Sequence, residues 1–378
     1  MLTRLRHLRR DERGMAFVYV GLGFMGFLAA TTLAIDVGMF MTARTQAQNS
    51  ADSGALAGAV ALYYNSYTDR SPTGPAVQSG MNTARANQVM RAVPSVDPPD
   101  VTFPLGPTGL DNRVQVTVYR TGPRNNAIPT LIGYLFGVSN VDITATAIAE
   151  VSPADTETCV LPFTVPDRWQ ENSAPPFDVD TSIFNQGTDV YIPAGQTGAT
   201  GYDAVRDKGV QLVLKTNNDN RTAPSFYNPL ALPGSTGASD YRDAIGGCNT
   251  SRFTIGDLLT SEPGNMVGPT RQGMQDLVDL DPGAYWEPSP GCNCVRNSNP
   301  AFTISPRIRP LPLYNPEYYE TGKHNGRNAD LKVGNWLGFF VERMNGNEVV
   351  GRIIPIAGLA STGAPPTGAF AAVIRLVQ

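Results

Sequence analysis

The amino-acid sequence predicts an α+β protein in which a single N-terminal transmembrane helix extends into a helix-on-sheet domain, followed by a mainly β domain. A long apolar segment near the N-terminus, residues 15–35, carries no charge. Later segments such as 112–121 alternate apolar and polar residues, which is typical of half-buried strands. Gly and Pro number 38 and 31 of 378 residues, and this share favours short strands joined by turns. The length is sufficient for two folded domains with their own cores.

The apolar segment has the length of a membrane span, since a helix needs about 20 residues to cross a bilayer. The Lys/Arg excess lies on its N-terminal side, at Arg4, Arg6, Arg9, Arg10 and Arg13. Such charges stay in the cytoplasm. We therefore predict a basic cytoplasmic tail at 1–14, a transmembrane helix at 15–41, and all later residues outside the cytoplasmic membrane. The alternative is a cleaved signal peptide, which has a shorter apolar region and a small-x-small cleavage site that this sequence does not clearly show.

Small residues recur within the span. The predicted membrane anchor comprises Met15, Gly26, Ala30, Ala34 and Ile35, and the three small residues among them are spaced four apart. A helix face of this kind lets helices approach closely in lipid. Gly and Ala are also common in membrane helices that make no such contact, and the sequence leaves both interpretations open.

The helix can continue outward, because no Pro occurs between residues 1 and 64. Two neighbouring rows of small residues follow the span at helical spacing: Ala47, Ala51, Ala55 and Ala59 in one row, and Ser50, Gly54 and Gly58 in the other. A Gly inside a helix costs about 1 kcal/mol relative to Ala, so we expect close packing to offset that cost. The prediction is a spine, half in the membrane and half in the core of an outer domain. A solvated Ala-rich helix is the alternative.

A specific order of residues follows the span. It comprises Asp36 and Gly38 in AIDVG, then Gln48, Asn49, Ala51, Asp52, Gly54, Ala55 and Gly58 in QNSADSGALAG. Together with the Arg-Gly pair at 13–14, these residues resemble the N-terminal region of the TadG-like proteins of the tight-adherence (Flp) pilus system. The resemblance covers about residues 10–62 and implies a pilin-like outline for the helix-on-sheet domain.

The resemblance also implies a function. It points to a membrane-anchored, non-enzymatic accessory or structural protein of Flp (type IVc) pilus assembly. Such a protein is expected in the bacterial cytoplasmic (inner) membrane as a single-pass protein, with its bulk periplasmic or extracellular. The expected partners are membrane lipid and pilus-assembly or pilin-like proteins.

Two features of related proteins are missing from the sequence. Tyr19 stands five positions after Gly14, where prepilin-type relatives carry Glu, and the D-x-S-x-S metal motif of von Willebrand A-like domains does not occur. Neither prepilin processing nor metal-dependent adhesion is therefore expected. A membrane-anchored surface adhesin or matrix-binding module is the alternative function, and it predicts exposed aromatic residues or Ca²⁺ sites on the second domain, such as around 314–319.

The boundary between the outer domains is expected near residue 152, which gives a first domain at 42–152 and a second at 153–378. In the first domain, the patterns predict helices at 75–92 and 129–136 and strands at 112–121 and 141–151. In the second, one helix is expected at 270–278, with strands at 159–165, 209–215, 302–311, 337–343, 349–357 and 370–376. A tight hairpin turn is expected at the Asn345-Gly346 pair.

The four cysteines are disulfide candidates. Cys159, Cys248, Cys292 and Cys294 all lie on the predicted outer side, where an oxidising compartment favours disulfides. Because Cys292 and Cys294 are only two positions apart, we expect each to bond to a distant partner. This gives two bridges that join Cys159 and Cys248 to Cys292 and Cys294, in an order that the sequence does not assign. Free thiols or a metal site are the alternatives, although C-x-C without a nearby His matches zinc sites poorly.

Composition and motifs argue against several activities. A net charge of −4 gives no global attraction to nucleic acid. His324 is the one histidine on the predicted outer side, and it lies in a polar segment. No G-x-S-x-G elbow and no phosphate-binding Gly-rich loop occurs. We therefore predict that the protein is not an enzyme and has no catalytic site, metal site, cofactor or small-molecule substrate.

Overall fold

The computed structural model describes residues 13–106, 109, 111–173, 175–194, 196–204, 206–217, 220–235, 237–324, 329–360 and 370–377. The chain divides into two compact units. The first comprises Met1–Ala59, Arg70–Glu150 and Leu376–Gln378, and the second comprises Val60–Asp69 and Val151–Arg375. Residues 1–12 of the predicted basic tail lie outside the described residues.

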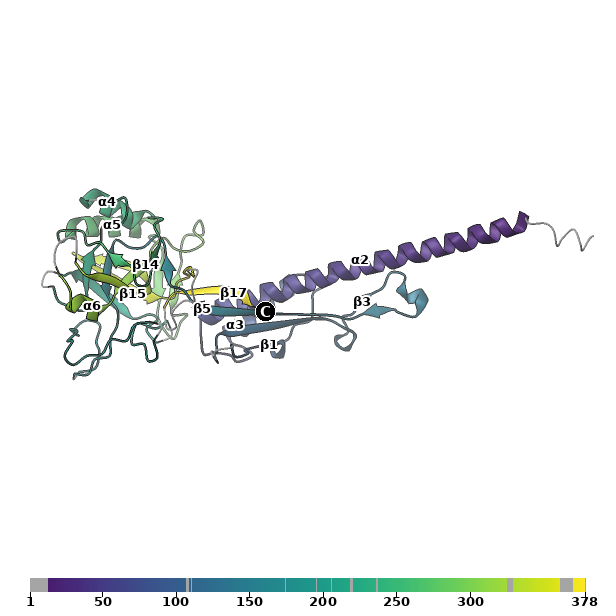
Figure 1. The fold of residues 1–378 in the computed structure, drawn as a ribbon, viewed down its shortest axis with the longest axis horizontal. Helices are drawn as coiled ribbons and strands as arrows, with labels where there is room; N and C mark the ends of the chain where they lie inside the picture. The colour runs from purple at the N-terminus through teal and green to yellow at the C-terminus, as the bar shows by residue number, and fades with distance from the viewer. Residues whose placement is uncertain are drawn as a thin grey trace, which may run out of the picture. The chain divides into compact units, whose positions relative to one another are not determined.

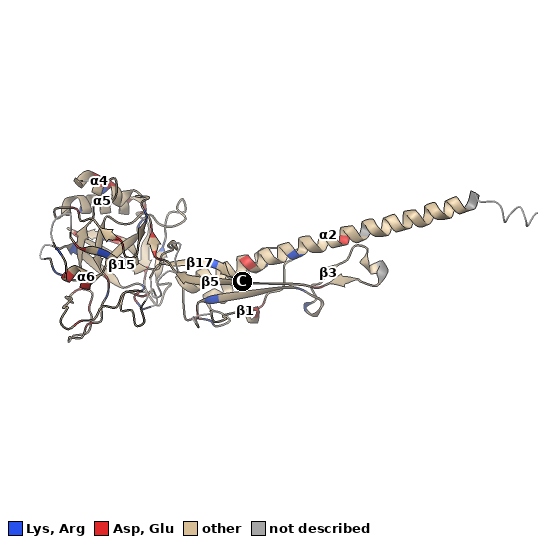
Figure 2. Cartoon of the chain, in the orientation of Figure 1, with Lys and Arg blue, Asp and Glu red and all other residues tan. Residues whose placement is uncertain are grey.

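The first described element is the helix α2 (Arg13–Tyr64), which has 52 residues (Figure 1). Residues 15–35 carry no Lys, Arg, Asp or Glu (Figure 2), and the described side chains in this stretch are exposed. By length and composition, α2 is able to cross a membrane. Its last turn, from Val60 onward, belongs to the second unit.

A second helix, α3 (Pro75–Ala86), accompanies α2 in the first unit. Pro75 opens the helix, where the missing N–H of Pro is harmless because the first helical N–H has no intrahelical partner. Its buried residues are mostly small: Ala76, Val77, Gly80, Met81 and Ala84. The helix is shorter than the predicted 75–92, because Asn87 takes up an extended backbone and ends it.

The sheet of the first unit places β2 between β1 and β5. Strand β2 (Arg113–Arg120) pairs antiparallel with β1 (Val101–Thr102) and with β5 (Ile143–Pro153). Every second residue of β2 is buried, which matches the alternation seen in the sequence. Two short 3₁₀ helices flank these strands, η1 (Pro98–Asp100) before β1 and η2 (Gly122–Arg124) after β2.

Residues 128–141 form a small hairpin rather than the predicted helix. Strand β3 (Ile128–Pro129) pairs with β4 (Asn140–Val141), and the 3₁₀ helix η3 (Gly133–Phe136) forms the tip between them. The prediction of a helix over 129–136 is wrong because Pro129 sits in an extended strand and Gly137, at φ 84, ends the turn after four residues.

The second unit contains a closed six-stranded barrel. In the order β15-β14-β7-β9-β8-β16, each strand pairs with the next, and β16 pairs back with β15. The strands are β7 (Phe163–Pro166), β8 (Gln211–Thr216), β9 (Phe226–Pro229), β14 (Ile308–Tyr314), β15 (Leu331–Asn345) and β16 (Glu348–Ile354). Most pairs are antiparallel, but β7–β14 and β8–β9 are parallel.

The long strand β15 is buried on both faces. Leu337 and Phe339 share a core with residues of two helices, α4 (Gly237–Gly246) and α5 (Val267–Leu280), which lie together beside the barrel (Figure 1). Trp336, on the opposite face of β15, belongs to a second apolar cluster. Burial on both faces explains why the strand shows little apolar–polar alternation in the sequence.

Shorter elements complete the second unit. They are β6 (Thr156–Glu157), β10 (Phe253–Thr254), β11 (Leu258–Leu259), β12 (Tyr285–Glu287), β13 (Cys294–Arg296) and α6 (Pro316–Glu320). The last strand, β17 (Ala372–Val377), divides between the units, with Ala372–Arg375 in the second and its last two residues in the first. The hairpin between β15 and β16 is confirmed, with Gly346 at φ 62 in its turn. The strand predicted at 302–311 begins only at Ile308, and α4 and β9 were not predicted. The mixed α+β class and the mainly β character of the second unit are confirmed.

Candidate functional site

The outward half of α2 meets α3 with almost no space between the two backbones. A Cβ atom built on Gly54 would lie 2.9 Å from the carbonyl oxygen of Gly80 and 2.9 Å from Cβ of Ala84. A Cβ on Gly80 would in turn lie 3.2 Å from the carbonyl oxygen of Gly54. We call Gly54, Gly58 and Gly80 the small-residue seam. Ser50 strengthens it, because its hydroxyl donates a 2.8 Å hydrogen bond to the carbonyl of Ala84.

The seam is covered by β2. A Cβ on Gly58 would lie 2.7 Å from Cγ1 of Val114, and a Cβ on Gly54 would lie 3.2 Å from Cγ1 of Val116. Both valines are fully buried. The second row of small residues on α2 is buried as well, at Ala47, Ala51, Ala55 and Ala59. The glycines of α2 therefore allow a helix, a second helix and a strand to meet within the core of the first unit.

The polar residues between the small ones lie at the edge of this core. Gln48 donates hydrogen bonds to Asp52 at 2.8 Å and to the carbonyl of Thr146 at 3.3 Å. Asn49 is exposed, and its carbonyl accepts a hydrogen bond from Ser53. Gln48 and Asp52 also line a shallow groove of about 590 Å³ together with Ile148. These side chains are available to a partner along this edge of the first unit.

Asp36 ties α2 to the hairpin at 128–141. Its carboxylate accepts hydrogen bonds from three successive backbone N–H groups, those of Leu131 at 2.9 Å, Ile132 at 3.1 Å and Gly133 at 2.8 Å. The last of these opens η3, so the carboxylate satisfies N–H groups that a helical turn leaves without intrahelical partners. Asp36 itself is buried, whereas a Cβ built on its motif neighbour Gly38 would meet nothing within 4 Å.

The predicted anchor residues lie on the exposed part of α2. Met15, Gly26, Ala30, Ala34 and Ile35 are all exposed. A Cβ on Gly26 would meet nothing within 4 Å. The structure therefore brings none of the small anchor residues together with another described element of the chain.

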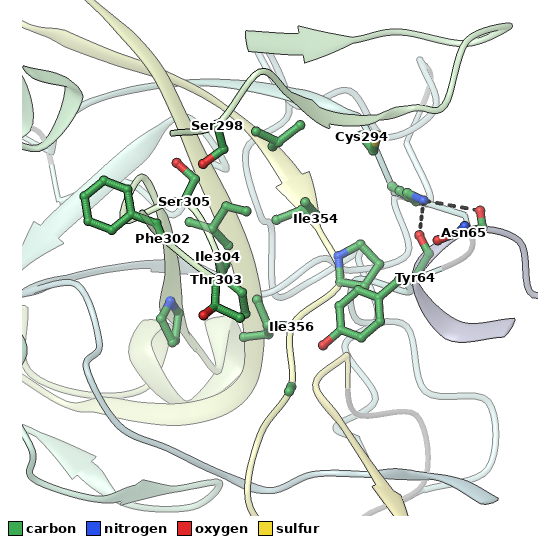
Figure 3. Close-up of a pocket in the computed structure, with 16 residues that line it drawn as sticks. Tyr64, Asn65, Cys294, Ser298, Phe302, Thr303, Ile304, Ser305, Ile354 and Ile356 are labelled. Atoms are coloured by element: carbon green, nitrogen blue, oxygen red, sulfur yellow. Dashed lines mark hydrogen bonds between the residues drawn. The ribbon is translucent and has the colours of Figure 1, made fainter. Parts of the chain in front are cut away.

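The second unit has an apolar pocket of about 450 Å³ (Figure 3). Its walls come mainly from Ile304, Ile308, Ile354 and Ile356, with Phe302 at one side. Segments far apart in the sequence build it, and no single motif marks it. Among its lining residues there is no Asp, Glu or His. The pocket is mostly apolar, with Tyr64 and Lys208 among its polar lining residues, and it therefore suits an apolar group such as a side chain.

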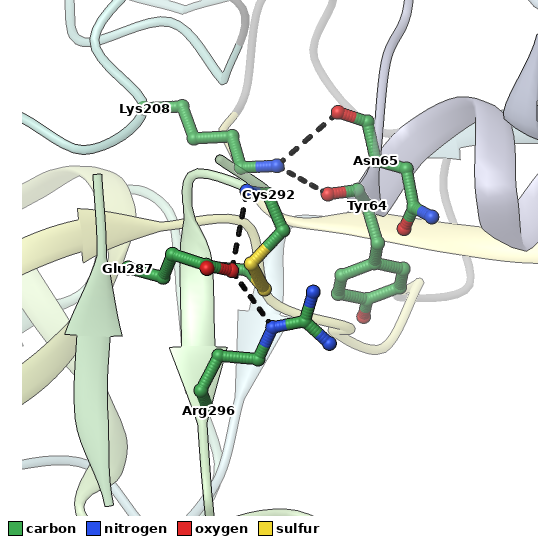
Figure 4. Close-up of a disulfide and its surroundings, with 7 residues drawn as sticks. Tyr64, Asn65, Lys208, Glu287, Cys292 and Arg296 are labelled. Carbon is green, nitrogen blue, oxygen red and sulfur yellow. Dashed lines mark hydrogen bonds and ion pairs between the residues drawn. A yellow bond between two sulfur atoms is a disulfide. The ribbon is translucent and has the colours of Figure 1, made fainter. Parts of the chain in front are cut away.

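Lys208 lies at the rim of this pocket. Its ammonium group donates hydrogen bonds to the carbonyls of Tyr64 and Asn65, at the C-terminal end of α2 (Figure 4). A cation here complements the partial negative charge at a helix C-terminus. Burial lowers the pKa of Lys208 below its ordinary value, and burial also raises the pKa of Tyr64 to about 12. Lys208 thus acts as a cap within the second unit.

The disulfides differ from the predicted pairing. Cys159 bonds to Cys248, and Cys292 bonds to Cys294 (Figure 4). The expectation that Cys292 and Cys294 each reach a distant partner is wrong. Asn293 between them has a φ of 48, which turns the chain so tightly that the two Cα atoms lie 5.2 Å apart, within bonding range.

Pairing between distant strands explains the other bridge. The antiparallel pair β6–β10 brings residues 156–157 against 253–254, and the N–H of Cys159 donates to the carbonyl of Asn249 at 2.9 Å. Cys248 is thereby held beside Cys159, with the Cα atoms 4.4 Å apart. The described residues contain no free cysteine.

Two buried carboxyl groups have raised pKa values. Burial raises the pKa of Glu157 to about 8 and that of Asp167 to about 6. Asp167 accepts hydrogen bonds from the N–H of Arg168, the N–H of Tyr202 and the hydroxyl of Tyr191, so it organises the surrounding loops. One oxygen of Glu157 has no hydrogen-bond partner among the described residues, which favours its protonated form.

Neither carboxyl group lines one of the three pockets described for the two units. Within the described ranges, no group of three or more His, Cys, Asp or Glu residues is placed to hold a metal ion. Sequence reasoning missed the partner of Asp36 and the apolar pocket, because both depend on contacts between segments that are distant along the chain.

Comparison with known families gives two matches. Residues 14–61 match a family described as Flp pilus-assembly TadE/G-like, and residues 39–149 match a family described as Tad-like Flp pilus-assembly. Both matches lie in the part of the chain that contains α2, α3 and the first sheet. No curated protein and no solved structure matches the chain.

Proposed function

Since residues 14–149 match Tad-like Flp pilus-assembly families, we propose that the protein is a membrane-anchored, non-enzymatic structural component of tight-adherence pilus assembly. One observation carries this proposal. The helix α2 runs without a break from an exposed apolar stretch into the buried core of the first unit. A single rigid element can therefore hold a folded unit directly at the membrane surface.

The proposed topology follows from charge. Within the predicted transmembrane helix at 15–41, the uncharged residues 15–35 cross the hydrocarbon core of the cytoplasmic membrane, and the Arg-rich residues before them stay in the cytoplasm. Both compact units then lie on the periplasmic or extracellular side. The two disulfides of the second unit support this placement, since disulfides persist in oxidising compartments.

The proposed partners are pilin-like or other pilus-assembly proteins. The first unit packs the outward half of α2 against α3 and β2, a helix-on-sheet arrangement that we propose is pilin-like in outline. In lipid, the face with Gly26, Ala30 and Ala34 offers a second helix a close approach. The groove beside Gln48 and Asp52 offers polar contacts on the outer side.

A structural role fits the chemistry of the pocket. Its lining is apolar, and its basic group, Lys208, is engaged with the end of α2. We therefore assign no reaction to the second unit and propose that it presents surface to a partner.

A clean gene deletion tests the proposed function. Surface pili are counted by electron microscopy in the wild type, in the deletion strain and in the strain that carries a plasmid copy. Loss of pili that the plasmid restores is the expected result. Normal pili combined with lost attachment to surfaces would instead support a surface adhesin.

A matched pair of variants connects this function to the span. Leu22→Arg places a charge within the apolar stretch, at a cost of about 2.5–3.5 kcal/mol for insertion. Leu22→Ile keeps the apolar character and serves as the control. We expect the plasmid with Leu22→Ile to restore pili and the plasmid with Leu22→Arg to restore fewer. Equal restoration by both would contradict the role of the span.

A further inference from the structure

The hairpin at 128–141 exposes apolar side chains at its tip. Leu131 is 57% exposed, Tyr134 is 59% exposed and Val138 is 49% exposed. The chain carries no charged residue from 125 to 141, although exposed loops are usually polar. An uncharged, apolar loop tip on a folded unit indicates that something covers it.

The tip has a defined shape. The N–H of Thr130 donates to the carbonyl of Ser139 at 3.1 Å, and its hydroxyl donates to the carbonyl of Val138 at 2.6 Å. The N–H of Val138 donates to the carbonyl of Gly133 at 3.0 Å. The backbone groups at the base of the tip are thus paired with one another, which lowers the cost of moving the tip into a less polar environment.

Asp36 fixes the height of the tip along α2. The carboxylate accepts hydrogen bonds from the N–H groups of Leu131, Ile132 and Gly133, so these hydrogen bonds hold the tip beside the helix at this residue. Asp36 directly follows Ile35, the last residue of the uncharged stretch. With a rise of about 1.5 Å per residue, the tip is held within one helical turn of the end of that stretch.

From this placement we propose that the tip of the hairpin, around Leu131 and Tyr134, inserts into the outer headgroup region of the membrane that α2 spans. The inference rests on the proposed span. Tyr is favoured at this depth because its ring is apolar and its hydroxyl remains in contact with water and headgroups. The apolar faces of interfacial helices, which occupy the same region, are buried about 5–10 Å into the boundary between headgroups and acyl chains.

The insertion gives Asp36 a role beyond packing. A carboxylate at the membrane surface loses part of its hydration, and the three backbone N–H groups replace it. The hairpin and α2 then contact the bilayer at two points, so the helix has less freedom to tilt or rotate about its own axis. The first unit would be held in one orientation above the membrane.

Depth-dependent quenching tests the proposal with the full chain in lipid vesicles of phosphatidylcholine and phosphatidylglycerol. All four native cysteines are in disulfides, so an introduced cysteine is the one free thiol for an environment-sensitive fluorophore. Tyr134→Cys reports on the tip, Phe24→Cys reports on the middle of the apolar stretch, and Asn82→Cys on the exposed side of α3 is the control for a site in water.

We expect lipids with a nitroxide near the headgroup to quench the label at position 134 strongly, and iodide in water to quench it weakly. The label at position 24 should respond to nitroxides deep in the acyl chains, and the label at position 82 to iodide alone. Adding Asp36→Asn should reduce the lipid quenching at position 134, because one oxygen that accepts backbone hydrogen bonds is replaced by an NH₂ group.

The outcomes separate the two proposals. If nitroxide lipids quench the label at position 24 but iodide quenches the label at position 134, the result supports the proposed span and refutes insertion of the tip. If the label at position 134 is shielded from both quenchers, protein rather than lipid covers the tip, and the proposal is again refuted. If the label at position 24 is open to iodide, the proposed span itself fails.

Discussion

The tight contact between Gly58 and Val114 predicts that Gly58→Ala destabilises the wild-type protein but stabilises the Val114→Ala variant. In the wild type, a Cβ at position 58 would lie 2.7 Å from Cγ1 of Val114 and 3.3 Å from the carbonyl oxygen of Ala76. Overpacking a core costs about 1–3 kcal/mol. Ala in place of Gly within a helix contributes about 1 kcal/mol in the opposite direction. Gly58→Ala should therefore destabilise the first unit by about 1 kcal/mol.

Val114→Ala removes the methyl groups that cause the contact. On its own it should cost about 2 kcal/mol, through lost burial and an unfilled cavity. In that background the 2.7 Å contact is gone, while a Cβ at position 58 would still lie 3.3 Å from the carbonyl oxygen of Ala76 and 3.6 Å from Cβ of residue 114. The helix propensity of Ala then dominates, and Gly58→Ala should stabilise the unit by about 1 kcal/mol. The coupling between the two positions is thus about 2 kcal/mol.

Amide hydrogen exchange measured by mass spectrometry is the appropriate assay, because all three Trp residues lie in the second unit and their fluorescence does not report on the first. Peptides from α3 and β2 should exchange about fivefold faster in Gly58→Ala than in the wild type. The same substitution should slow exchange by about fivefold in the Val114→Ala background. Peptides from the barrel serve as the internal control. A stabilising effect of Gly58→Ala in both backgrounds would refute the steric account of the seam.

Two further predictions concern the second unit. The first is that the two disulfides differ in their contribution to stability, because their cysteines are separated by 89 positions in Cys159–Cys248 and by 2 in Cys292–Cys294. From loop entropy, replacing Cys159 and Cys248 by Ala should lower the free energy of unfolding by about 4.5 kcal/mol, and replacing Cys292 and Cys294 by Ala should lower it by about 1.5 kcal/mol. Urea unfolding followed by Trp fluorescence measures both values, and equal decreases would contradict this prediction. Burial raises the pKa of Glu157 to about 8 from an ordinary 4.5, so between these values the folded protein holds a proton that the unfolded chain has lost. The free energy of unfolding should therefore fall by about 1.4 kcal/mol per pH unit between about pH 5.5 and 7 and less steeply towards pH 8. Glu157→Gln should flatten this fall, and an equally steep fall in that variant would exclude Glu157 as its source.

The sequence is most informative about α2. Spacing alone shows that Gly54 and Gly58 share a helix face, because the helical period decides it. Spacing does not show that Gly80 and Val114 meet that face, since those contacts join distant segments. Asp36 is visible as the first charge after the apolar stretch, but its hydrogen bonds depend on a hairpin that begins almost a hundred residues later.

The second unit was harder to predict for physical reasons. Closure of the barrel depends on pairings between strands that are distant in the sequence, and β15 lacks alternation because both of its faces are buried. The bridge between Cys292 and Cys294 depends on the positive φ of Asn293, a local conformation that spacing does not encode. The apolar pocket depends on both the barrel and that bridge, and it therefore has no signature in the sequence.

The central claim is that one continuous helix anchors the chain and carries its folded units to the outer side of the membrane. Thiol labelling with a membrane-impermeant maleimide tests it most directly in cells with a permeabilised outer membrane. Cysteine is placed either at Asn82, exposed on α3, or at Thr3 before the span. We predict that Asn82→Cys is labelled in these cells before lysis and that Thr3→Cys is labelled only after lysis. Labelling of Asn82→Cys only after lysis would contradict the account.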